Sequence, residues 1–334
     1  MNVDQAVQSL EQEPAPTAGD FTGMDVAILP LPALGDLTIY LRLGWLFHRA
    51  GANVTFHSNV LYSAREHFGW LTVHPEGDET LEVVAKRFDL LIAYRRQDKD
   101  SPWGSVVPEN VAFVAAKWIA SDAGMKGQSV TVRGRVFSGA SRAFCLDPRA
   151  AGTMVDWVDR YARDVFGLEL DTVEGFLAPH QHSVSANRVL IFPTTPEPKK
   201  NYWLTGFRLL ALMLQRRGWQ VDFICTPREH SAVAAALPGY TVRSFPDIKA
   251  LMDHVAGAST VISNDSGGGH LGSMMGLATY TITRRKKEFV WRPGFNKANT
   301  VIYPWFRFKW LGKYVWRPFV PVWRISRQMG RPGS

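Results

Sequence analysis

The chain has few cysteines, no long apolar run and no basic amino terminus. Its 334 residues include two cysteines, Cys145 and Cys225. Two are too few for a disulfide framework, so we interpret them as free thiols of a reducing compartment. No run of 18 apolar residues is present, and the first 22 residues contain four acids and no Lys or Arg. Neither a membrane-spanning helix nor a signal peptide fits this pattern. We therefore expect a cytoplasmic protein with a disordered lead-in over residues 1–22.

The positive charge is concentrated at one end of the chain. The formal net charge is +8, but 13 of the 38 Lys and Arg and one of the 30 Asp and Glu fall within residues 284–334. The last 51 residues thus carry a net +12 and the preceding 283 a net −4. A mildly acidic body disfavours nucleic acid as a partner, because phosphate backbones select basic surfaces.

Apolar strands alternate with amphipathic helices in both halves of the sequence. In the first half, strands are expected at 24–30 and 53–58 around a helix at 37–50. Between residues 188 and 283, five strand patterns alternate with four helix patterns. This order is typical of doubly wound parallel sheets, which bind ligands at the carboxyl ends of their strands. We predict an α/β protein divided into domains at 23–180 and 181–285, followed by a basic aromatic segment at 286–334.

A glycine-rich loop lies between one predicted strand and the next helix. Such a helix start favours a phosphate, since its N–H groups are free and its dipole is positive. The alternative is an ordinary turn in which the aspartate caps the helix. The candidate residues are Asp265, Ser266, Gly267, Gly268, Gly269 and His270.

Three further loops carry polar groups after predicted strands. Thr194, Thr195, Lys199 and Lys200 follow the strand at 188–192 and supply hydroxyls and cations, although exposed lysines are also typical of a surface turn. Glu229 follows the next strand. Asp36, after Gly35, follows the first strand, where it could act as a general base or as a helix N-cap.

The run Asp265-Ser266-Gly267-Gly268-Gly269-His270-Leu271 resembles the signature of glycosyltransferase family 9, the lipopolysaccharide heptosyltransferases. The resemblance implies a GT-B fold, in which two Rossmann-like domains face each other across a cleft. It implies that this loop, the Thr194–Thr195 pair and either Lys199 or Lys200 hold the donor diphosphate and ribose. It also implies that Glu229 lies at the donor nucleoside and that Asp36 is the general base. The apolar stretch Leu31–Leu34 replaces the family's polar residues before Gly-Asp.

The resemblance leads us to expect an inverting, metal-independent transferase that needs no cofactor. Its donor would be ADP-heptose and its acceptor a hydroxyl group of a glycan or glycolipid. The alternatives are a GT-B transferase with another nucleotide sugar or another acceptor, and a non-catalytic protein that binds a sugar nucleotide or a membrane. A dehydrogenase is disfavoured because no G-x-G-x-x-G follows the first strand.

Twelve aromatic residues lie between Phe289 and Trp323, interleaved with Arg and Lys. This composition suits contact with an anionic membrane surface, which would place the protein at the inner face of a membrane. Packing against the protein core and stacking on single-stranded nucleic acid are the alternatives. By the resemblance, part of this segment should pack back on the first domain.

Overall fold

The computed structural model describes residues 19–94, 107–116, 127–169, 174–178, 185–285 and 288–332. Most of the expected lead-in, residues 1–18, lies outside this description. Residues 19–22 belong to the fold and not to a disordered lead-in, because Phe21 is fully buried. Its ring packs edge-on against Phe47 and Phe166. An aromatic ring of this size stabilises the fold by burial, so the ordered chain begins ahead of the first strand.

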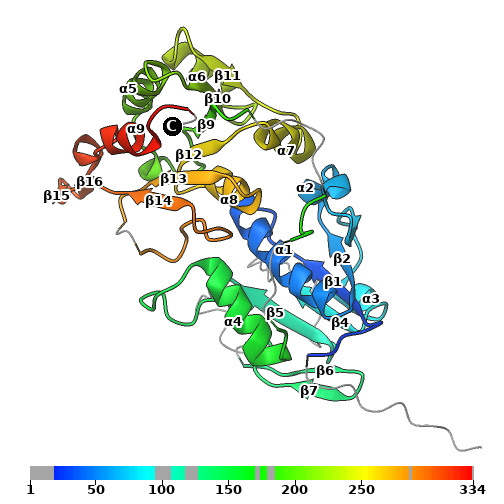
Figure 1. Ribbon diagram of the computed structural model, residues 1–334. Coiled ribbons are helices and arrows are strands. Elements are labelled where there is room, and N and C mark those ends of the chain that lie inside the picture. The colour runs from blue at the N-terminus through cyan, green and yellow to red at the C-terminus, as the bar shows by residue number, and fades with distance from the viewer. Residues whose placement is uncertain are drawn as a thin grey trace, which may run out of the picture.

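The first half is built on a six-stranded parallel sheet with the order β3-β2-β1-β4-β5-β8 (Figure 1). The strand β1 at its centre is almost continuously apolar, as expected for a parallel strand covered on both faces. The elements are β1 (Asp25–Leu29), α1 (Leu34–Arg49), β2 (Asn53–His57), α2 (Asn59–Tyr62), β3 (Leu71–His74), α3 (Leu81–Ala85), β4 (Leu90–Ala93), β5 (Val111–Ala115), β6 (Val130–Val132), β7 (Arg135–Phe137), β8 (Arg142–Ala143) and α4 (Met154–Phe166).

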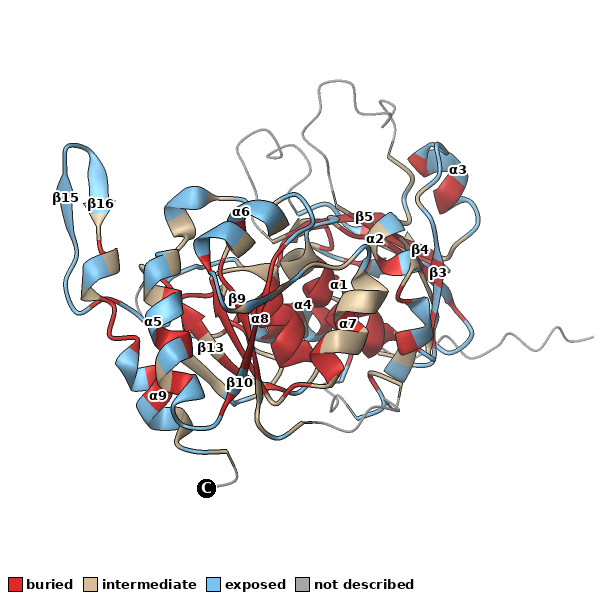
Figure 2. Cartoon of the chain, turned by 90° about the horizontal axis from the view of Figure 1, so that it is seen from above, coloured by how far each residue is buried: buried red, intermediate tan, exposed pale blue. Residues whose placement is uncertain are grey.

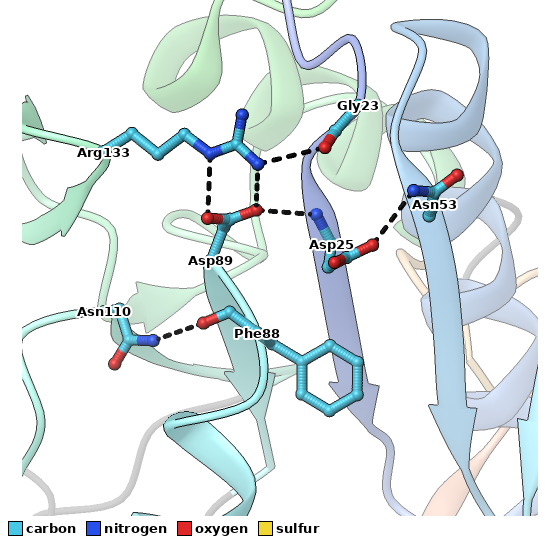
Figure 3. Close-up of polar contacts among 7 residues, drawn as sticks. All are labelled: Gly23, Asp25, Asn53, Phe88, Asp89, Asn110 and Arg133. Atoms are coloured by element: carbon cyan, nitrogen blue, oxygen red, sulfur yellow. Dashed lines mark hydrogen bonds and ion pairs between the residues drawn. The ribbon is translucent and has the colours of Figure 1, made fainter.

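Polar side chains tie the amino ends of these strands together (Figure 3). Arg133, in the turn between β6 and β7, donates from Nε and Nη2 to the two carboxylate oxygens of Asp89, both at 2.9 Å. The Asp89 carboxylate also accepts from the backbone N–H of Asp25. Asn53 completes the set by donating to the Asp25 carboxylate at 3.0 Å. This edge is the opposite one from the strand ends where ligands bind, so it stabilises the sheet away from the candidate site.

The second half repeats the arrangement with the order β11-β10-β9-β12-β13-β14, again parallel (Figure 1). All five strands expected between 188 and 283 are present, and β14 adds a sixth. The elements are β9 (Arg188–Phe192), α5 (Leu204–Gln215), β10 (Gln220–Ile224), α6 (His230–Ala236), β11 (Thr241–Arg243), α7 (Ile248–Ala256), β12 (Thr260–Asn264), α8 (Gly267–Met274), β13 (Ala278–Ile282), β14 (Asn299–Ile302), β15 (Phe308–Trp310), β16 (Lys313–Val315) and α9 (Trp323–Met329).

The segment that follows β13 divides between the two halves. Val290 lies on the first half, where its carbonyl accepts from the N–H of Met154 at the start of α4. The final helix α9 packs instead against α5 of the second half, where Ile325 is fully buried. Between them, the antiparallel hairpin β15–β16 projects from the body and is largely exposed (Figure 2). No helix among the described residues is long and apolar enough to cross a membrane.

The two halves meet where helix α1 contacts helix α8. In both views the two helices lie between the sheets, and most of α8 is buried (Figures 1 and 2). A side chain on Gly35 would come within 3.3 Å of the His270 ring, and one on Gly267 within 2.8 Å of Leu34 Cβ. The two helix starts therefore approach each other closely because each has a glycine at the contact.

Candidate functional site

The start of α8 has buried polar atoms that lack protein partners. The N-cap is Ser266, whose side chain makes no capping hydrogen bond. Asp265 precedes the cap, so the interpretation of Asp265 as the N-cap is wrong. Among the described residues, no partner is found for Ser263 Oγ, Ser266 Oγ or His270 Nδ1, although all three atoms are buried. Such orphaned groups at a helix start fit an anionic ligand that would accept from them.

The glycines of this loop are required by protein packing. A Cβ on Gly268 would lie 2.5 Å from the Phe192 ring, and one on Gly269 would lie 2.5 Å from Ser263 Oγ. On Gly267 it would meet Leu34 and the Gly35 nitrogen. The side-chain positions of the three glycines thus face β9, β12 and α1. The sequence motif is explained first by close helix packing, which leaves only the free N–H groups of the helix start for a ligand.

His270 lies inside the contact between the halves. It is 4% exposed, its ring stands edge-on to Trp291 at 5.9 Å, and burial lowers its pKa to about 4. The imidazole is therefore uncharged at neutral pH. It can offer a ligand a hydrogen bond through Nδ1 but no positive charge.

Asn264 joins the strand end of β12 to the loop after β9. It is fully buried; its Nδ2 donates to the Pro193 carbonyl at 2.7 Å, and its Oδ1 accepts from the N–H of Tyr202 at 2.9 Å. The side chain therefore fixes both ends of the 193–202 loop against β12. Asn264 was not among the residues predicted from the sequence, although a polar residue at the end of an apolar strand was a visible signal.

The loop held by Asn264 carries the two threonines and the two lysines. The Thr195 hydroxyl is engaged within the loop, where it donates to Asn201 Oδ1 at 2.7 Å, whereas Thr194 is half-buried. Both lysines pair with Glu197, at 3.0 Å from Lys199 and 2.8 Å from Lys200. These two ammonium groups hold the pKa of Glu197 at about 2. The loop is thus a small charged cluster fixed on the sheet.

The structure distinguishes the two lysines. The Lys199 side chain is 68% exposed, whereas that of Lys200 is 27% exposed and lines a small pocket with Asp265. The charge of Lys200 acts on both Asp36 and Asp265. Lys200 is therefore close enough to both the candidate base and Asp265 for its charge to act on them, whereas the Lys199 side chain is mainly exposed.

Asp36 is the third residue of α1, whose N-cap is Ala33. The interpretation of Asp36 as an N-cap is therefore wrong. Burial raises its pKa to about 6, with the Lys200 charge acting in the opposite direction. Burial likewise raises the pKa of Asp265, against the charges of Lys200 and Arg285. A half-buried carboxylate with a raised pKa in the first turn of a helix is a suitable proton acceptor near neutral pH.

Glu229 does not join this cluster. It follows β10, which is separated from β12 by β9, and its carboxylate accepts from the Thr226 hydroxyl at 2.6 Å. No sequence motif indicated Arg284 and Arg285, which line the small pocket with Lys200 and Asp265. Among the described residues, no three His, Cys, Asp or Glu side chains gather as a metal site would require.

Comparison with known proteins finds similarity to one family. Residues 159–303 match the sequence model of glycosyltransferase family 9 (heptosyltransferase). A search of curated proteins by sequence finds no match. The matched range covers the second sheet and the α8 loop, and Asp36 lies outside it.

Solved structures show the same fold over most of the chain. The Escherichia coli ADP-heptose lipopolysaccharide heptosyltransferase II has a TM-score of 0.60 at 15% identity, over 92% of this chain and 97% of its own. A family 9 glycosyltransferase from Veillonella parvula has a TM-score of 0.60 at 13% identity, over 88% and 90%. The E. coli heptosyltransferase WaaC has 0.57 at 13% identity, over 83% and 92%.

The expected GT-B fold is therefore confirmed, as is the resemblance of the α8 loop to family 9. The protein is a glycosyltransferase similar to the heptosyltransferases of family 9.

Proposed function

We propose that the protein transfers a heptose from ADP-heptose to a hydroxyl group of a glycan or glycolipid, with inversion at the anomeric carbon. The observation that carries this proposal is the position of Lys200, whose charge acts on both Asp36 and the α8 loop. A proton acceptor and an anion site thus both lie within the electrostatic reach of one cation. The similar WaaC structures contain ADP and ADP-2-deoxy-2-fluoro heptose, which supports the choice of donor.

In the proposed reaction, Asp36 accepts the proton of the acceptor hydroxyl. The hydroxyl oxygen forms a bond to the anomeric carbon as the bond to the diphosphate oxygen breaks on the opposite face. The electron pair leaves with the ADP, whose negative charge is stabilised by Lys200 and the N–H groups at Ser266–Gly268. His270 Nδ1 and the hydroxyls of Ser266 and Thr194 complete the diphosphate site, and Glu229 contacts the nucleoside. Thr195 and Lys199 act by shaping the loop.

The test is transfer by the purified protein from ADP-heptose to candidate acceptors, compared with UDP- and GDP-sugars. We expect ADP-heptose to give product with inverted configuration and to stabilise the protein against heat. Donor binding without transfer to any acceptor would favour the non-catalytic alternative. Metal independence requires full turnover in EDTA. This control matters because the sequence contains an Asp-x-Asp triplet, Asp98-Lys99-Asp100, which lies outside the described residues.

We also propose that the β15–β16 hairpin attaches the enzyme to the inner face of an anionic membrane. Its tip is apolar: Trp310 is 65% and Leu311 85% exposed. Leu311 has a φ of +46°, which a residue other than glycine rarely adopts. Lys309 and Lys313 flank the tip, so apolar and basic residues lie together at the end of the hairpin.

Part of the aromatic segment has the packing role that the sequence left open. Trp316, Val320 and Val322 are buried in the core of the second half. The membrane proposal is therefore limited to the exposed hairpin and does not extend over the whole of 289–323.

A further inference from the structure

An arginine-lined pocket lies between the end of β13 and the β15–β16 hairpin. Its volume is about 200 Å³. Arg284 and Arg285 reach it from the loop after β13, whereas the other lining residues come from the hairpin and its flanks. The lining residues are Arg284, Arg285, Arg307, Tyr314 and Trp316.

The arginines of this pocket have little negative charge near them. Among the described residues, their closest ion pair is the 3.8 Å approach of Arg285 Nε to Asp265 Oδ2. Arg307 donates to the Arg284 carbonyl at 2.6 Å, and the Arg284 guanidinium lies 5.4 Å from the centre of the Tyr314 ring. These contacts orient the guanidinium groups but do not neutralise them. Repulsion between neighbouring guanidinium groups is relieved when an anion binds among them. A guanidinium group can donate two parallel hydrogen bonds to two oxygens of one phosphate.

The pocket adjoins the candidate site without overlapping the expected nucleoside position. Arg284 and Arg285 also line the small pocket that contains Lys200 and Asp265. Lys200 in turn acts on Asp36. Glu229, at the expected nucleoside end, follows β10, which lies three strands from β13, about 14 Å away at the usual strand spacing. A group in the arginine pocket would therefore lie on the side of the diphosphate away from the nucleoside.

We propose that the arginine pocket binds a phosphate group carried by the acceptor, which is thus a phosphorylated saccharide. The inference rests on the proposed transferase function and specifies its acceptor class. Binding the phosphate beside Lys200 holds the acceptor in the cleft with a hydroxyl free to face Asp36. It also gives the basic residues around β13 and the hairpin a role beyond attachment to a membrane.

The experiment measures inorganic phosphate binding by titration calorimetry with the protein already saturated by ADP. We expect the wild type to bind phosphate under these conditions. The double variant Arg284→Gln/Arg307→Gln should bind it at least about tenfold more weakly. The single variant Arg307→Gln, at a residue that lines only the arginine pocket, should also bind phosphate more weakly while its affinity for ADP stays within about twofold. Arg284→Lys should lose less than Arg284→Gln, because the charge is kept. The control is Arg208→Gln, an exposed arginine on α5, which should change neither affinity. Thermal unfolding verifies that each variant is folded.

Three results would overturn the proposal. They are the absence of phosphate binding to the wild type with bound ADP, phosphate binding by the double variant equal to that of the wild type, and competition between ADP and phosphate for one site. Failure of the transferase proposal would look different, since ADP itself would then not bind, while the loss of phosphate binding on substitution of Arg284 could still be measured.

Discussion

Arg317 donates from Nε to the carbonyl oxygen of Asn201 at 2.6 Å, across 116 residues of sequence. Its Nη2 also donates to the Pro198 carbonyl at 3.0 Å. The loop between these two acceptors carries Lys199 and Lys200. A residue of the basic carboxyl-terminal segment therefore supports the backbone of the loop that supplies the candidate diphosphate lysine.

Replacing Arg317 with Met should loosen this loop. We expect the free energy of unfolding to fall by about 1–3 kcal/mol, because two charge-assisted hydrogen bonds are lost. The KM for the sugar nucleotide should rise more than kcat falls, since Lys200 is displaced and Asp36 is not. Steady-state kinetics and urea unfolding measure the two effects. Arg324→Met, at an exposed position on α9, is the control, and an unchanged KM in Arg317→Met would contradict the role assigned to this contact.

Asp36→Asn should abolish turnover and leave donor binding intact. In the wild type, kcat/KM should fall about tenfold per pH unit below about pH 6, because the base is protonated there. This decrease of kcat/KM at acid pH is measured from the pH profile with saturating acceptor. Retention of full turnover in Asp36→Asn would exclude Asp36 as the base.

The same substitution should make the protein more stable at pH 8. Burial raises the pKa of Asp36 from 3.8 to about 6. Between these two pH values, the carboxyl group therefore keeps its proton in the folded state and has lost it in the unfolded state. Stability therefore decreases as the pH rises through this window. Asparagine removes the cost of the buried charge, which we expect to stabilise by about 1–2 kcal/mol at pH 8 and not at pH 3. Asp164→Asn, on the exposed side of α4, should show no such pH-dependent gain. A stability loss at pH 8 in Asp36→Asn would contradict the prediction.

Gly268→Ala should destabilise the protein by about 1–3 kcal/mol, because the added methyl group would lie 2.5 Å from the Phe192 ring in a packed core. Donor affinity should fall with it, since the start of α8 must shift. Chemical denaturation and ADP titration are the measurements. Gly69→Ala has nothing within 4 Å of its added methyl group, and its effect should stay within about 0.5 kcal/mol. Equal stability of the two variants would show that α8 tolerates a larger separation from β9.

Trp310→Ser combined with Leu311→Asn should release the protein from membranes. We expect the wild type to bind vesicles of 70% phosphatidylcholine and 30% phosphatidylglycerol, and to bind neutral vesicles weakly. The double variant should bind at least about tenfold less, because a buried side chain of either type contributes about 1.5–3 kcal/mol. Leu209→Asn, which replaces a 53% exposed leucine on α5, is the matched control. Vesicle sedimentation measures both, and equal binding by the wild type and the double variant would rule out attachment through the hairpin.

Much of the fold was predictable because it depends on local patterns. The apolar runs at 24–30 and 188–192 are buried parallel strands, and helix α4 begins with the capping box of Thr153 and Asp156. The short β6–β7 hairpin, which turns at Arg133 and Gly134, was not part of the expected pattern. The strand β14 was missed because Asn299–Ile302 is short and its neighbours are polar or irregular.

The candidate site was predictable only as a set of loops at strand ends. The sequence could not distinguish Lys199 from Lys200, since both follow the same strand. The two differ only in whether the side chain faces the protein or the solvent, which depends on the folded loop. Nor could it show that Asn264 fixes the adjoining loop, because its partners Pro193 and Tyr202 are more than 60 residues away.

The sequence by itself determined the doubly wound α/β architecture and the resemblance of the α8 loop to glycosyltransferase family 9, because periodicity and a short motif are local properties. Only the tertiary structure decided which charges meet. It separated the buried Trp316 from the exposed Trp310 within one aromatic segment, and it brought Arg284 beside Arg307 and Arg317 beside Asn201. The physical reason is that burial, pKa and electrostatic environment depend on neighbours that the chain brings together only when both sheets have formed and packed.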